Sequence, residues 1–172
     1  AQAMLDHLIA YLRATLGASR SALHPLSEEF ARLADYLALI AVRMGPRLQY
    51  RLDLPDALRD VPVPPLLLQP LVENAIRHGL EPQVAGGSVT VQARLLEGGA
   101  RLQLSVPDTG AGPGAAEETT GTRFGLRQVR ERLATLYGSA ATLELIAASA
   151  GGTSATVTFP LKHATDRPDR RG

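Results

Sequence analysis

The sequence contains no cysteine and no tryptophan, and only 4% of its residues are aromatic. The absence of cysteine excludes disulfide bonds and thiolate metal sites. The formal net charge is only +1, so a general nucleic-acid or membrane-surface role is not favoured. No apolar run approaches the roughly 20 residues that a membrane-spanning helix needs. With 172 residues, 45% of them hydrophobic, we expect a soluble chain of one domain with an appendage.

The first 45 residues carry apolar side chains at helical spacing in two segments. Residues 3–16 form the first predicted helix, which the segment GASRS ends. The second predicted helix lies in LSEEFARLADYLALIAVRMG, with Ser27 as its N-cap and with Gly45 and Pro46 ending it. We expect these helices to form a hairpin. The sequence starts without methionine and already in helical phase, so we expect it to be part of a longer protein.

From residue 48 onward the apolar residues alternate with polar ones, which is typical of half-buried strands. Five segments follow this pattern: LQYRLDL, SVTVQARL, RLQLSV, TLELIA and TSATVTFPL. Two helices, at about 64–79 and 124–137, are expected between them, and a hairpin turn at Gly98 and Gly99. We predict a two-layer α/β sandwich whose helices cover one face of the sheet. Residues 164–172 have no periodic pattern and predict a loose tail.

The segment QPLVENAIRHGLEP combines an apolar helical stripe with a polar cluster of Glu73, Asn74, Arg77 and His78. Asn74 and His78 lie four residues apart and are expected on one helical face. A polar pair of this kind is usually no more than a solvated flank. The cluster alone therefore does not identify a site.

Two glycine-rich segments add to the polar cluster. VPDTGAGPG places Asp108 where a predicted strand ends, so that its carboxylate could accept a hydrogen bond from a ligand amine. GTRFGL places Gly121 and Gly125 before the last predicted helix, where free backbone N–H groups and the helix dipole favour an anion such as phosphate. An amine at one end and a phosphate at the other describe a nucleotide.

The order of these motifs resembles the ATPase superfamily of histidine kinases, gyrase, Hsp90 and MutL, which shares the Bergerat nucleotide-binding fold. More narrowly, PPLLLQPLVENAIRHGL, the preceding LSEEFARLADYLALIAVRMG and the closing GGTSATVTFPL look like the LytS/YehU family of bacterial sensor histidine kinases. The resemblance runs from about residue 4 to 161. It implies an α/β (α+β) sandwich with a mixed, mainly antiparallel sheet. It also implies a partial dimerisation and phosphotransfer region at 1–45, a catalytic domain at 46–163 and a tail at 164–172.

The resemblance implies roles for the polar cluster. Asn74 would coordinate the Mg²⁺ that bridges the phosphates of ATP, because a neutral amide oxygen is a suitable hard ligand. Arg77 would place charge near the phosphates or lie on a solvated face, and His78 would line the pocket near the ribose or phosphates. Glu73 would either assist catalysis through the Mg²⁺ water shell or pair with Arg77 four residues on.

The resemblance also implies that Asp108 accepts from the exocyclic amine of adenine. Gly110 and Gly112 would form the floor of the base site, and residues 113–120 a mobile ATP lid. The remaining residues implied to contact the nucleotide follow the lid: Gly121, Thr122, Arg123, Gly125 and Leu126.

Several positions depart from the family pattern. Thr109 replaces the usual asparagine of the Asp-Asn-Gly motif, and Pro107, which has no N–H, stands where most members have a residue with one. Arg123 stands where glycine is common. The sequence alone therefore does not determine how tightly the nucleotide binds or how freely the lid moves. The gyrase-like and Hsp90-like hydrolases place a glutamate four residues before the asparagine, and Pro70 stands there instead. This difference favours a kinase over a hydrolase.

No Pro-His-Phe segment with an acceptor histidine occurs in the sequence. We therefore expect the catalytic domain of a two-component sensor histidine kinase, which transfers the γ-phosphate of ATP to an upstream histidine for relay to a response regulator. The intact protein is expected to be a homodimer whose catalytic domain is cytoplasmic, with the membrane reached only through upstream segments. The alternative is an ATP- or ADP-binding sensing or dimerisation module without kinase activity.

Overall fold

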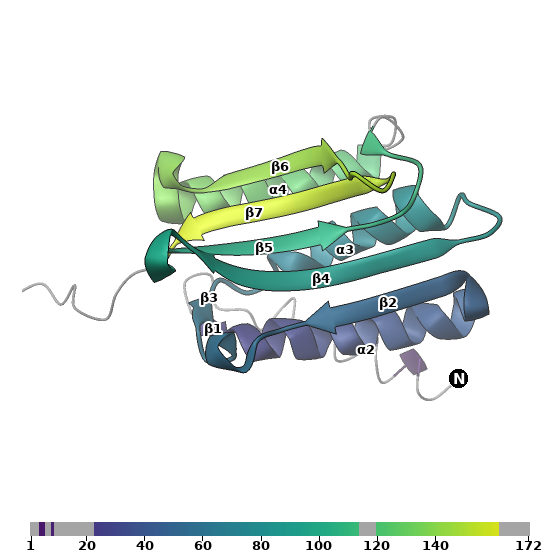
Figure 1. The fold of residues 1–172 in the computed structure, drawn as a ribbon, viewed down its shortest axis with the longest axis horizontal. Helices are drawn as coiled ribbons and strands as arrows, with labels where there is room; N and C mark the ends of the chain where they lie inside the picture. Colours follow the sequence, from purple (N-terminus) through teal and green to yellow (C-terminus); the bar gives the residue numbers. More distant parts are fainter. Residues whose placement is uncertain (1–3, 6–7, 9–22, 114–119, 162–172) are drawn as a thin grey trace, which may run out of the picture.

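The structure, a computed structural model, describes Met4, Leu5, Leu8 and the residues 23–113 and 120–161. Within this part a five-stranded sheet has the strand order β2-β4-β5-β7-β6 (Figure 1). The strands are β2 (Leu48–Asp53), β4 (Gly87–Leu96), β5 (Arg101–Pro107), β6 (Thr142–Ala147) and β7 (Thr153–Pro160). β2 is parallel to β4, whereas the other neighbours are antiparallel. All five predicted strands and the mixed, mainly antiparallel sheet are confirmed.

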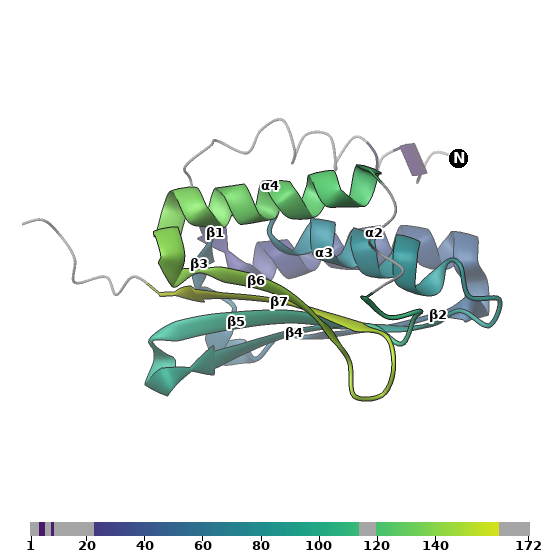
Figure 2. The ribbon, with the colours of Figure 1, turned by 90° about the horizontal axis from the view of Figure 1, so that it is seen from above.

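The helices lie on one face of this sheet, so that the molecule has two layers (Figure 2). They are α2 (Leu26–Met44), α3 (Leu68–Asn74) with its π-helical continuation η3 (Ala75–Leu80), and α4 (Thr120–Tyr137). Short 3₁₀ turns are η1 (Gly45–Arg47), η2 (Asp56–Leu58), η4 (Glu97–Gly99) and η6 (Gly138–Ala140). Strands β1 (His24–Pro25) and β3 (Pro62–Val63) form a separate small sheet beside the start of α2.

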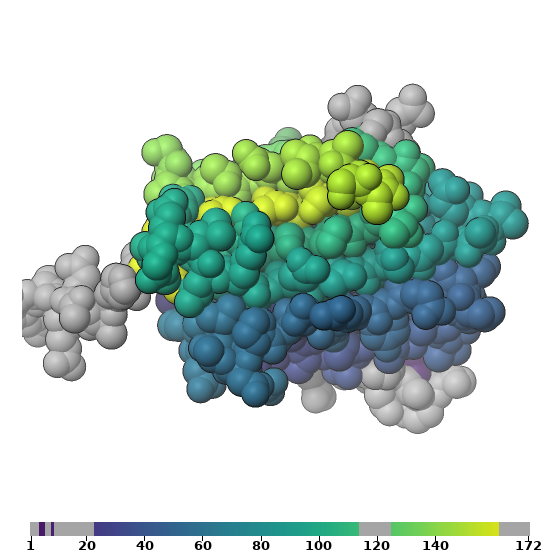
Figure 3. All heavy atoms as spheres, viewed as in Figure 1, coloured from purple at the N-terminus to yellow at the C-terminus, as the bar shows by residue number. Residues whose placement is uncertain are grey.

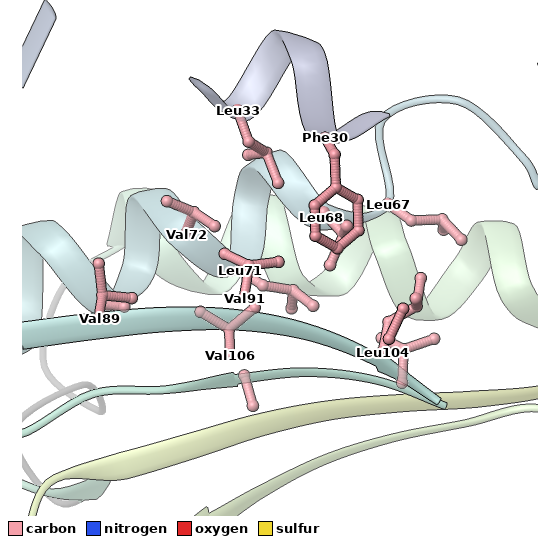
Figure 4. Close-up of a cluster of buried hydrophobic side chains, with 14 of the residues drawn as sticks. Phe30, Leu33, Leu67, Leu68, Leu71, Val72, Val89, Val91, Leu104 and Val106 are labelled. Carbon is pink, nitrogen blue, oxygen red and sulfur yellow. The ribbon is translucent and has the colours of Figure 1, made fainter. Parts of the chain in front are cut away.

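The core lies between the two layers. Alternation along β5 turns Leu102, Leu104 and Val106 to the helices, and all three are fully buried. Figure 4 shows Phe30 and Leu33 of α2 above the leucines of α3, which in turn face the valines of β4. The sheet is therefore covered by α2 in addition to α3 and α4, the two helices that were predicted to cover it.

The other face of the sheet carries no helix among the described residues, and Figure 3 shows it as a surface made from the strands themselves. The residues of β5 that point to this side, such as Gln103 and Ser105, are polar and partly exposed. Within the part of the chain that the structure describes, no helix is long and apolar enough to cross a membrane.

Two predicted helix starts and one cap were wrong. Ser27 is not the N-cap of α2, because the helix begins at Leu26 and its first N–H groups bond to the carbonyl groups of Val61 and Arg59, both at 2.9 Å. The helix predicted from 64 begins only at Leu68, since Leu66 before it has a left-handed φ of 62°. The helix predicted from 124 begins already at Thr120. The predicted helix 3–16, apart from Met4, Leu5 and Leu8, and the tail 164–172 lie outside the described residues.

Candidate nucleotide site

Asn74 is the last residue of α3 and its side chain is buried, with 6% exposed. Its side-chain oxygen Oδ1 has no hydrogen-bond partner within the described part of the chain. A buried polar atom is normally satisfied, so this orphan acceptor calls for a partner that the described residues do not provide. An amide oxygen of this kind fits a hard divalent cation such as Mg²⁺.

The helix changes its winding directly after Asn74. In η3 the N–H of Glu81 donates to the carbonyl oxygen of Ile76 at 2.8 Å, five residues back. Asn74 lies in α3 and His78 in η3, so the pair predicted on one helical face spans the change from α-helical to π-helical winding. Single π turns often occur at functional sites.

The other members of the polar cluster differ in exposure. Arg77 is exposed, whereas Glu73 and His78 are partly buried. Burial and the positive charge of Arg77 lower the pKa of His78, and Glu81 counteracts this. Among the described ion pairs none joins Glu73 to Arg77, since Glu73 accepts instead from Gln69 Nε2 at 3.2 Å. The pairing alternative for Glu73 is thus not formed, and its catalytic role stays a prediction.

Asp108 follows β5 and is held in place by backbone groups on two sides. Its side chain is 4% exposed, and its Oδ1 accepts from the N–H groups of Gly110 at 2.8 Å and Thr153 at 3.3 Å. Its own N–H donates to the carbonyl oxygen of Thr153 at 2.8 Å. Burial raises the pKa of the Asp108 carboxyl, and the two hydrogen bonds to Oδ1 oppose that shift. Within the described residues Oδ2 accepts no hydrogen bond, so one acceptor remains for a ligand.

Glycines allow the backbone to approach Asp108 closely. A Cβ on Gly79 would lie 2.8 Å from Asp108 Oδ1, and one on Gly110 would lie 2.2 Å from the carbonyl oxygen of Gly79. A Cβ on Gly152 would lie 2.0 Å from the carbonyl oxygen of Asp108. The helix that carries Asn74 and the loop that carries Asp108 are therefore packed directly against each other.

Gly79, Gly152 and Thr153 belong to this site although the sequence did not single them out. Gly79 directly follows the polar cluster, and this position in the sequence could have identified it as a residue of the site. Gly152 and Thr153 lie at the start of β7, and only the antiparallel pairing of β7 with β5 brings them to Asp108. No local sequence pattern reveals that pairing.

The structure shows what Thr109 does in place of the asparagine that is usual in the Asp-Asn-Gly motif. Its hydroxyl oxygen accepts from the N–H of Ser88 at 2.9 Å, and its own N–H donates to the carbonyl oxygen of Ser88 at 3.0 Å. Thr109 thus fastens the loop to the first residues of β4. Pro107 ends β5 opposite Ser154 of β7. Gly112 has φ of 90°, a conformation that favours glycine.

The glycine motif GTRFGL, residues 121–126, lies inside α4 and not before it. Because α4 begins at Thr120, the expectation that Gly125 immediately precedes a helix N-terminus was wrong, and the free N–H groups belong to the first turn, which includes Gly121, Thr122 and Arg123. The side chains of Thr122 and Arg123, and the predicted lid apart from Pro113 and Thr120, lie outside what the structure describes. Gly125 faces α3, since a Cβ added to it would lie 3.6 Å from Pro70 Cβ, and Leu126 is buried in the core.

The three motifs meet at one end of the molecule. In Figures 1 and 2 the last turn of η3, the end of β5 and the start of α4 lie at the same end of the sheet. The described residues contain no group of three or more histidine, aspartate or glutamate side chains that could hold a metal ion alone. A cation at Asn74 would therefore take most of its ligands from phosphate and water, as Mg²⁺ commonly does.

The family described as histidine kinase-, DNA gyrase B-, and HSP90-like ATPase matches residues 64–163. The chain belongs to this ATPase family. The predicted superfamily is thereby confirmed, and with it the use of ATP.

Curated relatives of this ATPase domain are sensor histidine kinases. YpdA of Escherichia coli K12 is 33% identical over 145 residues, which cover 80% of this chain and 25% of YpdA. The sensor histidine kinase/phosphatase LytS of Staphylococcus aureus is 31% identical over 163 residues, 89% of this chain and 28% of LytS. The chain thus spans about a quarter of the length of these relatives. The predicted LytS-type resemblance is confirmed.

A solved structure shows the same fold. The histidine kinase domain from the Erythrobacter litoralis EL346 blue-light activated histidine kinase matches with a TM-score of 0.59 at 22% identity, covering 88% of this chain and 69% of that domain. The Bergerat-type sandwich is confirmed. The ATPase domain is an ATP-binding catalytic domain of the sensor histidine kinase type.

Proposed function

We propose that this ATPase domain binds Mg²⁺-ATP with Asn74 and Asp108 and donates the γ-phosphate to a histidine that lies N-terminal to the domain. The observation that carries the proposal is the buried Oδ1 of Asn74, which lacks a partner among the described residues. Asn74 directly precedes the turn that packs its Gly79 against Asp108. Asn74, the proposed metal ligand, and Asp108, the proposed acceptor for the base, therefore lie on segments that pack against each other.

Asp108 selects the base. Its carboxylate accepts a hydrogen bond from the exocyclic amine of adenine, whereas guanine presents a carbonyl group at that position. Hydrogen bonds from two backbone N–H groups hold Oδ1, so the carboxylate keeps its orientation and Oδ2 would accept from the base. The close packing of Gly79 and Gly110 leaves no Cβ between the carboxylate and the backbone around it.

Asn74 would hold the magnesium ion, with Glu73 beside it in the water shell. A bound Mg²⁺ would neutralise negative charge on the phosphates. Arg77 and the first turn of α4, with Gly121, Thr122 and Arg123, would contribute positive charge and N–H donors toward the phosphates. His78 would line the ribose or phosphate part of the site.

The acceptor is a histidine and not water. Pro70 occupies the place where the related hydrolases carry a glutamate to activate water, and it faces Gly125. Phosphoryl transfer to an imidazole needs positioning and charge neutralisation, without a dedicated base for water. The bond between the γ-phosphorus and the ADP oxygen breaks, a phosphorus–nitrogen bond forms, and ADP leaves.

The remaining features belong to the whole protein. We expect a homodimer, in which the phosphoryl group passes on to a response regulator, with the domain on the cytoplasmic side.

Titration calorimetry tests the base and metal assignments. The chain should bind ATP with Mg²⁺ and discriminate against GTP, and Asp108→Asn should weaken adenine nucleotides strongly because the charge-assisted acceptor is lost. Asn74→Ala should weaken Mg²⁺-dependent ATP binding and leave adenosine nearly unaffected. Equal affinity for ATP and GTP would contradict the role of Asp108, and equal weakening of ATP and adenosine would contradict the role of Asn74.

Acid-labile phosphate from labelled ATP tests the transfer. The chain alone should give only trace hydrolysis and no phosphohistidine, whereas the intact protein should give phosphohistidine, because the imidazole is then positioned and proximity lowers the barrier by several kcal/mol. Robust hydrolysis by the chain alone would favour a hydrolase. An intact protein that binds ATP and transfers nothing would be a sensing module, with Arg123→Gly the first variant to examine.

A further inference from the structure

The helix that ends at Asn74 has no N-terminal cap of its own. Leu67 precedes α3 in the cap position and offers no side-chain hydrogen bond, and Leu66 before it has a left-handed φ of 62°. The entry sequence PPLLL contains no serine, threonine, aspartate or asparagine, the residues that usually cap a helix. The first N–H groups of α3 therefore need an acceptor from elsewhere in the chain.

Glu29 of α2 provides that acceptor. Its Oε1 accepts from the N–H of Leu67 at 2.8 Å and of Leu68 at 3.4 Å, and its Oε2 accepts from the N–H of Leu66 at 3.2 Å. The side chain is almost completely buried, with 3% exposed. One carboxylate thus binds three successive backbone N–H groups across 37 to 39 residues of sequence.

The carboxylate is held in the charged form that a cap requires. His24 Nε2 lies 3.0 Å from Glu29 Oε2. Burial raises the pKa of Glu29, but the hydrogen bond and charge of His24 and the N–H groups of Leu66 and Leu67 together lower it below its ordinary value. A negative charge at the N-terminus of a helix is also favoured by the helix dipole.

The opposite end of α2 is tied to the turn that follows Asn74. Arg43 forms an ion pair with Glu81, and Arg47 donates to the carbonyl oxygens of Glu81 at 3.1 Å and Gln83 at 2.6 Å. Between the two ends, Phe30 and Leu33 pack on the leucines of α3 (Figure 4). α2 is therefore joined to the segment from α3 to η3 at both ends and by apolar packing between them.

We infer that Glu29 is a positioning residue for Asn74. α3 has only seven residues, so its first N–H groups and its last side chain are less than two turns apart. We expect a shift at the start of α3 to move Oδ1 of Asn74 most, because Asp108, although it packs against Gly79 of η3, is also held by β7 and its own loop. This inference rests on the proposed function, in which Asn74 is the magnesium ligand.

The experiment compares Glu29→Ala and Glu29→Gln with the unchanged chain by calorimetry, using ADP with Mg²⁺, ADP with a chelator, and adenosine. In Glu29→Ala the gain in ADP affinity on adding Mg²⁺ should fall about tenfold, in line with the loss of a helix cap. Glu29→Gln should lose less, because its amide oxygen still accepts from Leu67. Adenosine affinity should change much less than the Mg²⁺-dependent gain in both variants.

Two matched variants control for stability and for local charge. Val157→Ala removes buried apolar contacts in β7, and Glu28→Ala removes the exposed neighbouring carboxylate that also contacts His24. Both should keep the full Mg²⁺-dependent gain. A loss in Val157→Ala equal to that in Glu29→Ala would reduce Glu29 to a stabilising residue and overturn the inference.

Hydrogen exchange of the amides of Leu67 and Leu68 checks that the cap has been removed. If Glu29→Ala does not fold, Glu29→Gln decides, since it keeps the size of the side chain. A folded variant with faster amide exchange and an undiminished Mg²⁺-dependent gain overturns the inference, and so does exchange that stays as slow as in the unchanged chain. No Mg²⁺-dependent gain in the unchanged chain would instead refute the proposed function.

Discussion

Gly79→Ala should damage the site through a single methyl group. The added Cβ would lie 2.8 Å from Asp108 Oδ1 and 3.0 Å from its Cγ, closer than an ordinary contact allows. The carboxylate cannot simply move away, because Oδ1 is held by the N–H groups of Gly110 and Thr153. Either the backbone of η3 shifts or these hydrogen bonds lengthen, and both alter the base site.

The matched control is Gly125→Ala in α4, where the new Cβ would lie 3.6 Å from Pro70, an ordinary contact. Both glycines are helical and neither has a positive φ, so the general preference of helices for alanine, about 1 kcal/mol, applies to both and cancels in their comparison. The remaining difference is the cost of overpacking, about 1–3 kcal/mol. Gly79→Ala should therefore be less stable than Gly125→Ala by this amount.

Urea unfolding measures the difference in stability, and calorimetry with adenosine reports on the base site. We expect distortion of the base site to relieve about 1.4 kcal/mol or more of the overpacking strain in Gly79→Ala. Restoring the site on binding would cost the same free energy, so adenosine affinity should fall about tenfold or more. The reasoning is refuted if the two alanine variants are equally stable and Gly79→Ala binds adenosine like the unchanged chain.

Three further predictions concern acid titration and the loop after η3. The stability that Glu29 contributes is fully present above pH 4.5 and lost as pH falls through its lowered pKa, so Glu29→Gln should flatten the acid limb of urea stability. The pH dependence of stability that comes from Asp108 has the opposite sign. The stability that Asp108 contributes is greatest below pH 3.8 and is lost as pH rises through its raised pKa. Asp108→Asn should therefore remove this fall of stability with rising pH. Arg47→Ala should cost about 1–3 kcal/mol in urea unfolding, because three hydrogen bonds to loop carbonyl groups disappear, whereas Arg51→Ala on β2 should cost far less.

The strands could be predicted from the sequence because each buries one face only. Alternation along β5, with Leu102, Leu104 and Val106 inward, is a local signal that the fold does not override. The predicted order of motifs also located Asn74 and Asp108, since each lies at the end of an element that periodicity reveals.

The starts of the helices could not be predicted because their caps are not local. Glu29 caps α3 from 37 or more residues away, and the first N–H groups of α2 bond to the carbonyl groups of Val61 and Arg59. Ser27, the residue that local rules select, is not the cap. The π turn of η3 has no local signature either.

The boundary predicted at residues 45 and 46 divides the chain by function, whereas the packing joins the two sides. Leu26, Leu33 and Leu37 of α2 are buried in the same core as α3 and the sheet. Removing α2 would expose these contacts and would also take away the carboxylate that caps α3. Because α2 is thus built into the fold of the nucleotide domain, we expect a displacement of α2 to reach Asn74 through Glu29. On the proposed role of Asn74, such a displacement should change magnesium-dependent binding.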